Sequence, residues 1–118
     1  MAKKKQRNEL VFLEDIIECI DKIIEYVEGV SENDFEKNIE KQDAVIRRIE
    51  IIGEAVKSIS TKTRDMYPDI PWREMAGMRD IVIHEYFGIS IGMVWRVAVS
   101  DIPKLKSQIE KVISDQSQ

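Results

Sequence analysis

The chain has 118 residues, enough for one domain whose core needs no disulfide or metal to hold it together. Hydrophobic residues make up 43% and charged residues 34%, which is ordinary for a helix-rich globular protein. The net charge of -4 argues against a protein that coats nucleic acid through overall positive charge, so any nucleic acid must be held by a local group of cations.

Neither reactive cysteine chemistry nor membrane contact is indicated. Cys19 is the single cysteine and lies among apolar residues, so a buried, inert thiol is expected. No apolar run approaches the length of a membrane span, and no signal-type apolar region follows the basic start. We therefore expect a cytoplasmic protein in which residues 1–9 form a flexible basic tail and residues 10–118 form a single domain.

The first helix is predicted over residues 10–30. Its apolar residues recur at helical spacing, with acidic residues and a lysine on the opposite side. The apolar stripe consists of Leu13, Ile16, Ile17, Ile20, Ile23, Ile24 and Val27. Gly29 and the polar residues that follow predict a turn, where Ser31 or Asp34 can cap the next helix and Phe35 packs at its entry.

A second helix is predicted over residues 34–60 and is expected to be the longest. Ile51 and Ala55 put apolar surface on a further side of it, so it should meet more than one neighbour, and the extra neighbour can be another subunit. Gly53 in mid-helix costs about 1 kcal/mol relative to alanine, which close approach of another helix or a ligand would explain. Glu54 is a solvated carboxylate or a polar support for the site described next.

The remaining helices follow a connection at residues 61–70 that has its own short turn. Pro71 fits the first turn of a helix starting near Trp72, and a last helical segment runs over residues 91–113, with a possible restart at Asp101 and Pro103. No alternating pattern of a strand is present. The predicted fold is an all-α, antiparallel up-and-down bundle of four main helices.

The candidate catalytic residues of the chain lie close together, within residues 78–88. The segment contains Arg79, Asp80, Tyr86 and the single histidine, His84, before Gly88, which can end a helix. On a helix, Asp80 and His84 lie one turn apart, so both the carboxylate and the helix C-terminus favour a charged imidazole. Such a histidine suits proton transfer, and an arginine suits a phosphate.

A purely structural interpretation of the same residues is equally available from the spacing. The histidine can cap the last carbonyls of the helix, Tyr86 can be a core ring with a hydrated hydroxyl, and Arg79 with Asp80 can be solvated. The pattern Arg-x4-His is short, and the spacing alone favours this interpretation.

The sequence resembles the HepT-like toxins of the HEPN superfamily. Residues 79–86 match their motif, R-x4-H-x-Y, and Glu85 fills its variable position. Further blocks resemble that family in the same order along most of the chain. These blocks are residues 49–55, 71–80, 94–95 and 101–105, whereas the basic tail lies outside the resemblance.

The resemblance implies a metal-independent ribonuclease that needs no cofactor and acts as a dimer. The resemblance also implies that the ribonuclease is the toxin of a toxin–antitoxin pair. Arg79 and His84 would be the catalytic pair, and Asp80 occupies the polar position after the arginine. Tyr86 matches the tyrosine that the partner, a minimal nucleotidyltransferase antitoxin, modifies with AMP from ATP. Gly53 and Glu54 are supporting candidates, and no residue is expected to bind a metal.

The chemistry raises one difficulty for a single chain. Cleavage by the neighbouring 2′-hydroxyl needs a base and an acid, yet each chain has one histidine. On an ideal helix Arg79 and His84 also point about 140° apart. Both difficulties ease if a two-fold axis brings two chains to one cleft.

Two other classes of protein fit the same sequence. One is a noncatalytic HEPN module that binds a nucleotidyltransferase or a nucleotide and uses Arg79 only to contact phosphate. The other is a structural helical dimer, in which neither Arg79 nor His84 affects anything beyond stability. Arg47, Arg48, Arg73 and Arg96 are candidates for a local basic surface, although a solvated helix face is the favoured interpretation of each.

Overall fold

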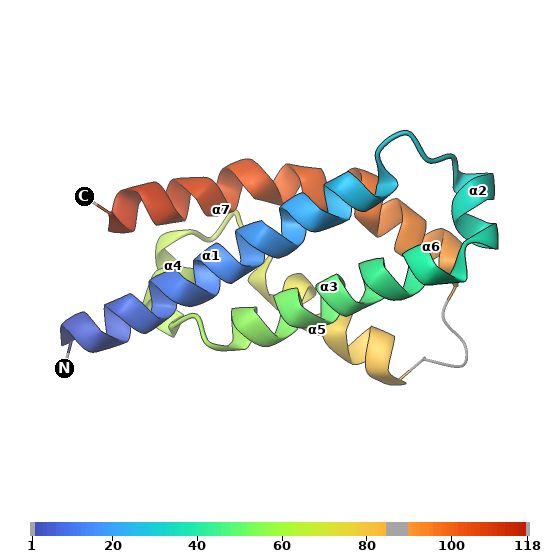
Figure 1. The fold of residues 1–118 in the computed structure, drawn as a ribbon. Coiled ribbons are helices and arrows are strands. Elements are labelled where there is room, and N and C mark those ends of the chain that lie inside the picture. The colour runs from blue at the N-terminus through green and yellow to red at the C-terminus, as the bar shows by residue number, and fades with distance from the viewer. Residues whose placement is uncertain (1, 85–89, 118) are drawn as a thin grey trace.

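The computed structural model describes the backbone of residues 2–84 and 90–117 and the side chains of residues 9–78 and 90–117. Across these ranges the chain is all-α, without a strand. Four main helical segments form the bundle, and successive segments run in opposite directions (Figure 1). They are α1 (Ala2–Val27), α3 (Ile39–Lys57), α5 (Trp72–His84) and the run of α6 (Ile91–Arg96), η1 (Val97–Asp101) and α7 (Ile102–Gln116). The predicted all-α bundle is confirmed.

Helix α1 is longer at its start than the sequence indicated. It begins at Ala2 rather than near residue 10, so the backbone of residues 2–9 continues the helix. It ends at Val27, and Gly29 follows with φ of 71°, a left-handed conformation that glycine adopts without strain. The division into a tail of residues 1–9 and a domain of residues 10–118 stays a prediction.

The single helix predicted over residues 34–60 is two helices. Asn38, with φ of -112° and ψ of 89°, interrupts it between α2 (Glu32–Lys37) and α3. The Asn38 side chain caps α3 by accepting a hydrogen bond from the Lys41 N–H at 3.0 Å. The prediction that this would be the longest helix is also wrong, because α3 has 19 residues and α1 has 26. Of the two predicted caps, Ser31 and Asp34, it is Ser31 that caps α2, by accepting a hydrogen bond from the Asp34 N–H at 3.1 Å.

Helix α3 has more than one neighbour within its own chain. It packs along both α1 and α5, and it also contacts α2 and α6. Ala55 is buried and Ile51 is partly buried against the core. The apolar surface on the further side of this helix is therefore covered inside the chain to a large extent, and it does not by itself require a second subunit.

The last main segment passes through one wider turn before Pro103. A proline has no N–H, so Pro103 cannot bond the carbonyl four residues earlier, and its ring crowds that carbonyl. The chain forms the π-helical turn η1 there, and the Ile102 N–H donates to the Val97 carbonyl. Pro103 then occupies the first turn of α7, as the predicted restart requires.

One hydrophobic core lies between the main helices. Its fully buried side chains come from α1, α3, α5 and the last segment, together with Phe35 of α2. Examples are Leu13, Ile16, Ile20, Ile23, Val45, Ile49, Ile52, Met75, Ile102 and Ile109. Among the described residues, no helix is long and apolar enough to cross a membrane.

Candidate active site

Helix α5 carries the motif, and its first turns are firmly held. Trp72 and Met75 are buried, and the Trp72 indole N–H donates to the Tyr67 carbonyl at 3.0 Å. The helix packs along α3 and continues to His84. The predicted helix from Trp72 to the motif is therefore confirmed up to His84. Tyr86, Glu85 and Gly88 lie outside the described residues, as do the side chains of Arg79, Asp80 and His84.

The helical backbone sorts the motif into two rows along α5. With 100° per residue, position 79 stands in line with the buried residues Trp72 and Met75. Positions 80 and 84 instead continue the row of Arg73, which is exposed, and Gly77. The backbone thus supports the separation of about 140° between positions 79 and 84 that the ideal helix predicts.

The supporting candidates Gly53 and Glu54 stand on the neighbouring helix. Both belong to α3, which packs along α5. Gly53 is buried, in keeping with a position at which another element comes close, whereas Glu54 is exposed. Their part in the site stays a prediction.

The connection into α5 is tied to two other elements, α3 and α7. Arg64, in α4 (Thr61–Met66), caps the end of α3 by donating to the Val56 carbonyl at 2.6 Å and to the Ile59 carbonyl at 3.2 Å. The Tyr67 hydroxyl donates to Asp115 Oδ2 at 2.6 Å, which fastens the connection to α7. This hydrogen bond raises the pKa of Tyr67. These contacts fix the position at which α5 starts.

The four arginines proposed for a basic surface have different surroundings. Arg48 lies beside Cys19, with 3.8 Å between Nη1 and Sγ. Arg47 pairs with Glu50 at 3.4 Å on the surface of α3. Arg73 and Arg96 are exposed and make no hydrogen bond or ion pair within the described parts of the chain. Arg73 alone of the four belongs to the helix of the motif.

Cys19 is buried between α1 and α3, as predicted. Burial raises the pKa of its thiol, and the nearby guanidinium of Arg48 lowers that pKa only in part. The thiol is therefore protonated at neutral pH and a poor nucleophile.

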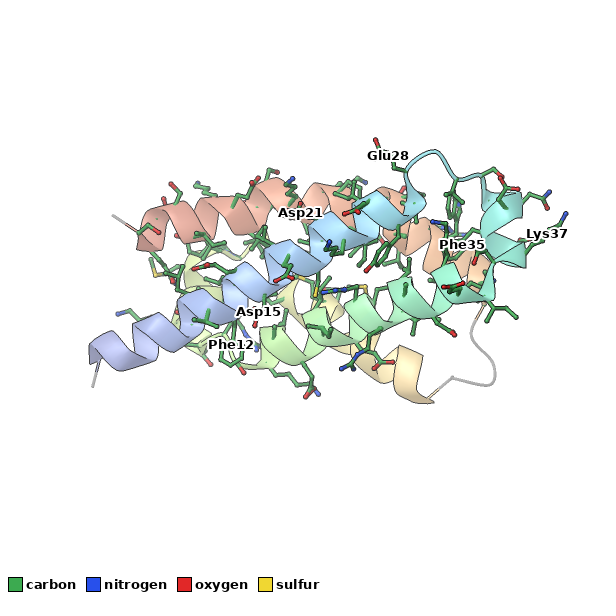
Figure 2. All side chains as sticks on the ribbon, in the orientation of Figure 1. Phe12, Asp15, Asp21, Glu28, Phe35 and Lys37 are labelled. Carbon is green, nitrogen blue, oxygen red and sulfur yellow. The ribbon has the colours of Figure 1, made fainter. Side chains whose placement is uncertain are left out.

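The exposed side of α1 is acidic. Asp15, Asp21 and Glu28 lie along it (Figure 2), together with Glu14, Glu18 and Glu25. Lys106 offsets part of this charge through an ion pair with Asp21 at 2.9 Å. Such a surface repels the phosphates of nucleic acid, so an RNA has to approach from another side.

Comparison with known proteins decides the family. A family model described as "Ribonuclease HepT-like" matches residues 16–112, which include α3 and α5 and most of the last segment, together with the second half of α1. The chain belongs to the HepT-like ribonuclease family of the HEPN superfamily. No solved structure gives a match.

Several curated relatives are similar over most of this HepT-like chain. A "Probable ribonuclease HepT" of Thermococcus cleftensis is 45% identical over 91% of the chain and 97% of its own length. A "Putative RNase" of Methanocaldococcus jannaschii is 41% identical over 91% of the chain and 98% of its own length. A "Gamma-glutamylcyclotransferase and putative RNase" of the same organism is 49% identical over 89% of the chain, which spans only 47% of that relative.

Two features of the structure were not singled out from the sequence. Gly77 was not recognised as a position with free space, because the space depends on which side of α5 is covered. The buried carboxylate of Glu9 was also missed, because its hydrogen-bond partners are 51, 54 and 107 residues away. No local pattern in the sequence could have indicated either feature.

Proposed function

We propose that this chain is the ribonuclease toxin of a type VII toxin–antitoxin system of the HepT/MntA kind, acting on RNA in the cytoplasm. The observation that carries the proposal is the position of the motif. Arg79 and His84 stand in the later turns of a helix whose start is packed and hydrogen-bonded. The family match over residues 16–112 supports ribonuclease chemistry at this helix.

In the proposed reaction no metal ion is needed. The 2′-hydroxyl beside the scissile phosphate attacks the phosphorus, and the 5′-oxygen of the next nucleotide leaves. His84 moves a proton in this step, and the Arg79 guanidinium stabilises the charge that grows on the phosphate oxygens. Asp80, one turn before His84, favours the charged imidazole. Gly53 and Glu54 support Arg79 from α3.

The active unit is a homodimer. The backbone of α5 separates positions 79 and 84 by about 140°, and each chain supplies one histidine. Two chains related by a two-fold axis can bring Arg79 of one chain to His84 of the other. The same axis forms two equivalent sites, each with Arg79 of one chain and His84 of the other.

Control of the toxin acts through Tyr86. A minimal nucleotidyltransferase antitoxin transfers AMP from ATP to the tyrosine hydroxyl and releases pyrophosphate. The added phosphate brings negative charge and bulk two residues after His84. It competes with the RNA phosphate for the same cations, so modification and substrate binding exclude each other.

The first experiment compares expression of the wild type with expression of His84→Ala. Growth arrest with cleaved cellular RNA is expected for the wild type only, because the variant has lost the group that moves the proton. Lys111→Ala, an exposed substitution on α7, serves as the control and is expected to behave as the wild type. Intact mass of each purified protein shows whether AMP is present.

Two results would contradict this function. If His84→Ala arrests growth and cleaves RNA as the wild type does, the proposed chemistry is wrong. If unmodified wild-type protein leaves RNA and growth unaffected, while still binding a nucleotidyltransferase, the chain is a noncatalytic partner module. Co-expression of the antitoxin should restore growth and add AMP to Tyr86, whereas Tyr86→Phe should stay toxic.

A further inference from the structure

We propose that Arg73 binds a phosphate of the RNA several nucleotides from the scissile one. The substrate then lies along the row of Arg73, Gly77 and His84 on α5, from His84 toward the start of the helix. This inference rests on the proposed function and extends it by one binding residue. It concerns a contact away from the reacting atoms, and Arg73 takes no part in proton transfer.

The Arg73 side chain has no partner among the described residues. It is exposed and makes no hydrogen bond or ion pair with any residue in the described parts of the chain. Arg48 is engaged with Cys19, Arg47 is paired with Glu50, and Arg64 caps α3. Arg73 and Arg96 are therefore the arginines without a partner among the described residues, and Arg73 alone of these two belongs to the helix of the motif.

Helical register places position 73 and position 84 in one row along α5. Positions 73, 77, 80 and 84 fall within about 60° of one another around α5, at 100° per residue. Arg73 and His84 are separated along the axis by about 16 Å, taking 1.5 Å per residue. A single strand of RNA that lies along this row therefore places a phosphate several nucleotides from the scissile one beside Arg73.

The side of α5 between Arg73 and His84 is open at Gly77. Gly77 lies between them in the same row, and a Cβ placed on it would meet no atom of a neighbouring element within 4 Å. A glycine with this much space allows a sugar–phosphate backbone to come close to the helix. The row is thus unobstructed at the one intermediate position whose surroundings the structure describes.

The charge around the row limits where the RNA can lie. The exposed side of α1 is acidic and repels phosphate. Beyond Arg73, the hollow at the start of α5 is lined by three carboxylates, those of Asp65, Asp69 and Glu74, and by two arginines, Arg73 and Arg64, of which Arg64 is engaged in capping α3. These carboxylates make further phosphate contacts unfavourable, so the RNA path ends at Arg73.

The test measures RNA binding separately from cleavage. A labelled single-stranded RNA is titrated, over a series of salt concentrations, with His84→Ala protein and with the same protein carrying Arg73→Ala, Arg73→Lys or Lys111→Ala. Lys111 is the matched control, since it is an exposed cation on α7, on the side of the bundle away from α5 (Figure 1). Thermal unfolding of each protein checks that its fold is intact.

Arg73→Ala is expected to weaken binding about 3- to 10-fold and to reduce the slope of log affinity against log salt by about 0.7, the value for one phosphate contact to a single strand. Arg73→Lys should keep the slope, because the charge stays. Equal affinity and slope for Arg73→Ala and Lys111→Ala would overturn the inference, as would the absence of RNA binding in all four proteins. If the proposed function itself is wrong, a different result is seen, because the wild type then does not cleave RNA.

Discussion

At the scale of single residues, Glu9 is the most highly connected polar side chain of the described structure. It is 8% exposed and accepts hydrogen bonds from the Ser60 N–H at 2.7 Å, the Thr63 hydroxyl at 2.8 Å and the Gln116 amide at 3.0 Å. One carboxylate thereby joins α1 to the start of α4 and to the end of α7. Burial acts to raise the pKa of Glu9, but these hydrogen bonds together outweigh it and hold the pKa below the usual 4.5.

Glu9→Ala is expected to lower the free energy of unfolding by about 2 kcal/mol at neutral pH, because three buried or part-buried hydrogen bonds to a charged acceptor are lost. Since the folded pKa is depressed, this stabilisation is present above the unfolded pKa and is lost as the pH falls through the folded value. Urea unfolding over a series of acidic pH values measures both effects. The control is Glu14→Ala, on the exposed side of the same helix. Equal stability of the two variants at every pH would contradict the prediction.

At the scale of helices, glycine has two opposite uses in this chain. Gly29 ends α1 with φ of 71°, a conformation that costs a residue with a side chain roughly 1–2 kcal/mol. Gly77 lies inside α5 with ordinary helical backbone and with free space where a side chain would be. Packing within the described chain therefore gives no reason for glycine at position 77, whereas close approach of RNA or of a second chain does.

The same substitution should consequently have opposite effects at the two positions. Gly77→Ala is expected to raise the free energy of unfolding by up to about 1 kcal/mol, because alanine favours the helix and meets no neighbouring element. Gly29→Ala is expected to lower it by about 1 kcal/mol, because alanine is strained at positive φ. Chemical denaturation of both variants measures the changes. A loss of stability in Gly77→Ala would show that the space beside α5 is not free in solution.

At the scale of the whole molecule, the described side chains of residues 9–78 and 90–117 form one core within a single chain. Helix α3 packs along α1 and α5, and the apolar side chains that the sequence offered as a subunit interface are buried or partly buried in the chain. The case for a dimer thus rests on chemistry. Positions 79 and 84 lie on different sides of α5, and the chain has one histidine.

Mixing two inactive proteins tests whether the cleft is shared. Arg79→Ala and His84→Ala protein are each expected to lack RNA cleavage. After co-expression, or after unfolding and refolding together, roughly a quarter of wild-type activity should return, because half the dimers are mixed and each has one intact site of two. The control mixes His84→Ala with a protein carrying both substitutions. No recovery in the first mixture, with mixed dimers shown by mass, would mean that each site uses one chain.

The sequence by itself determined which segments are helical and where the motif lies. Apolar periodicity and local capping predicted α1, the start of α5, the cap at Ser31 and the restart before α7, because these features depend on residues within a few turns. The resemblance in residues 79–86 indicated the family that the match over residues 16–112 shows.

Only the tertiary structure decided which helix sides are covered and which polar groups meet. The partners of Glu9, the burial of Ala55 and the free flank of Gly77 depend on segments far apart in sequence. The break at Asn38 is local by contrast, since the Gln42 amide bonds the Phe35 and Glu36 carbonyls across it, and apolar periodicity does not indicate such a bond. Periodicity shows that a helix has an apolar side, but packing against distant elements determines what fills the space beside it.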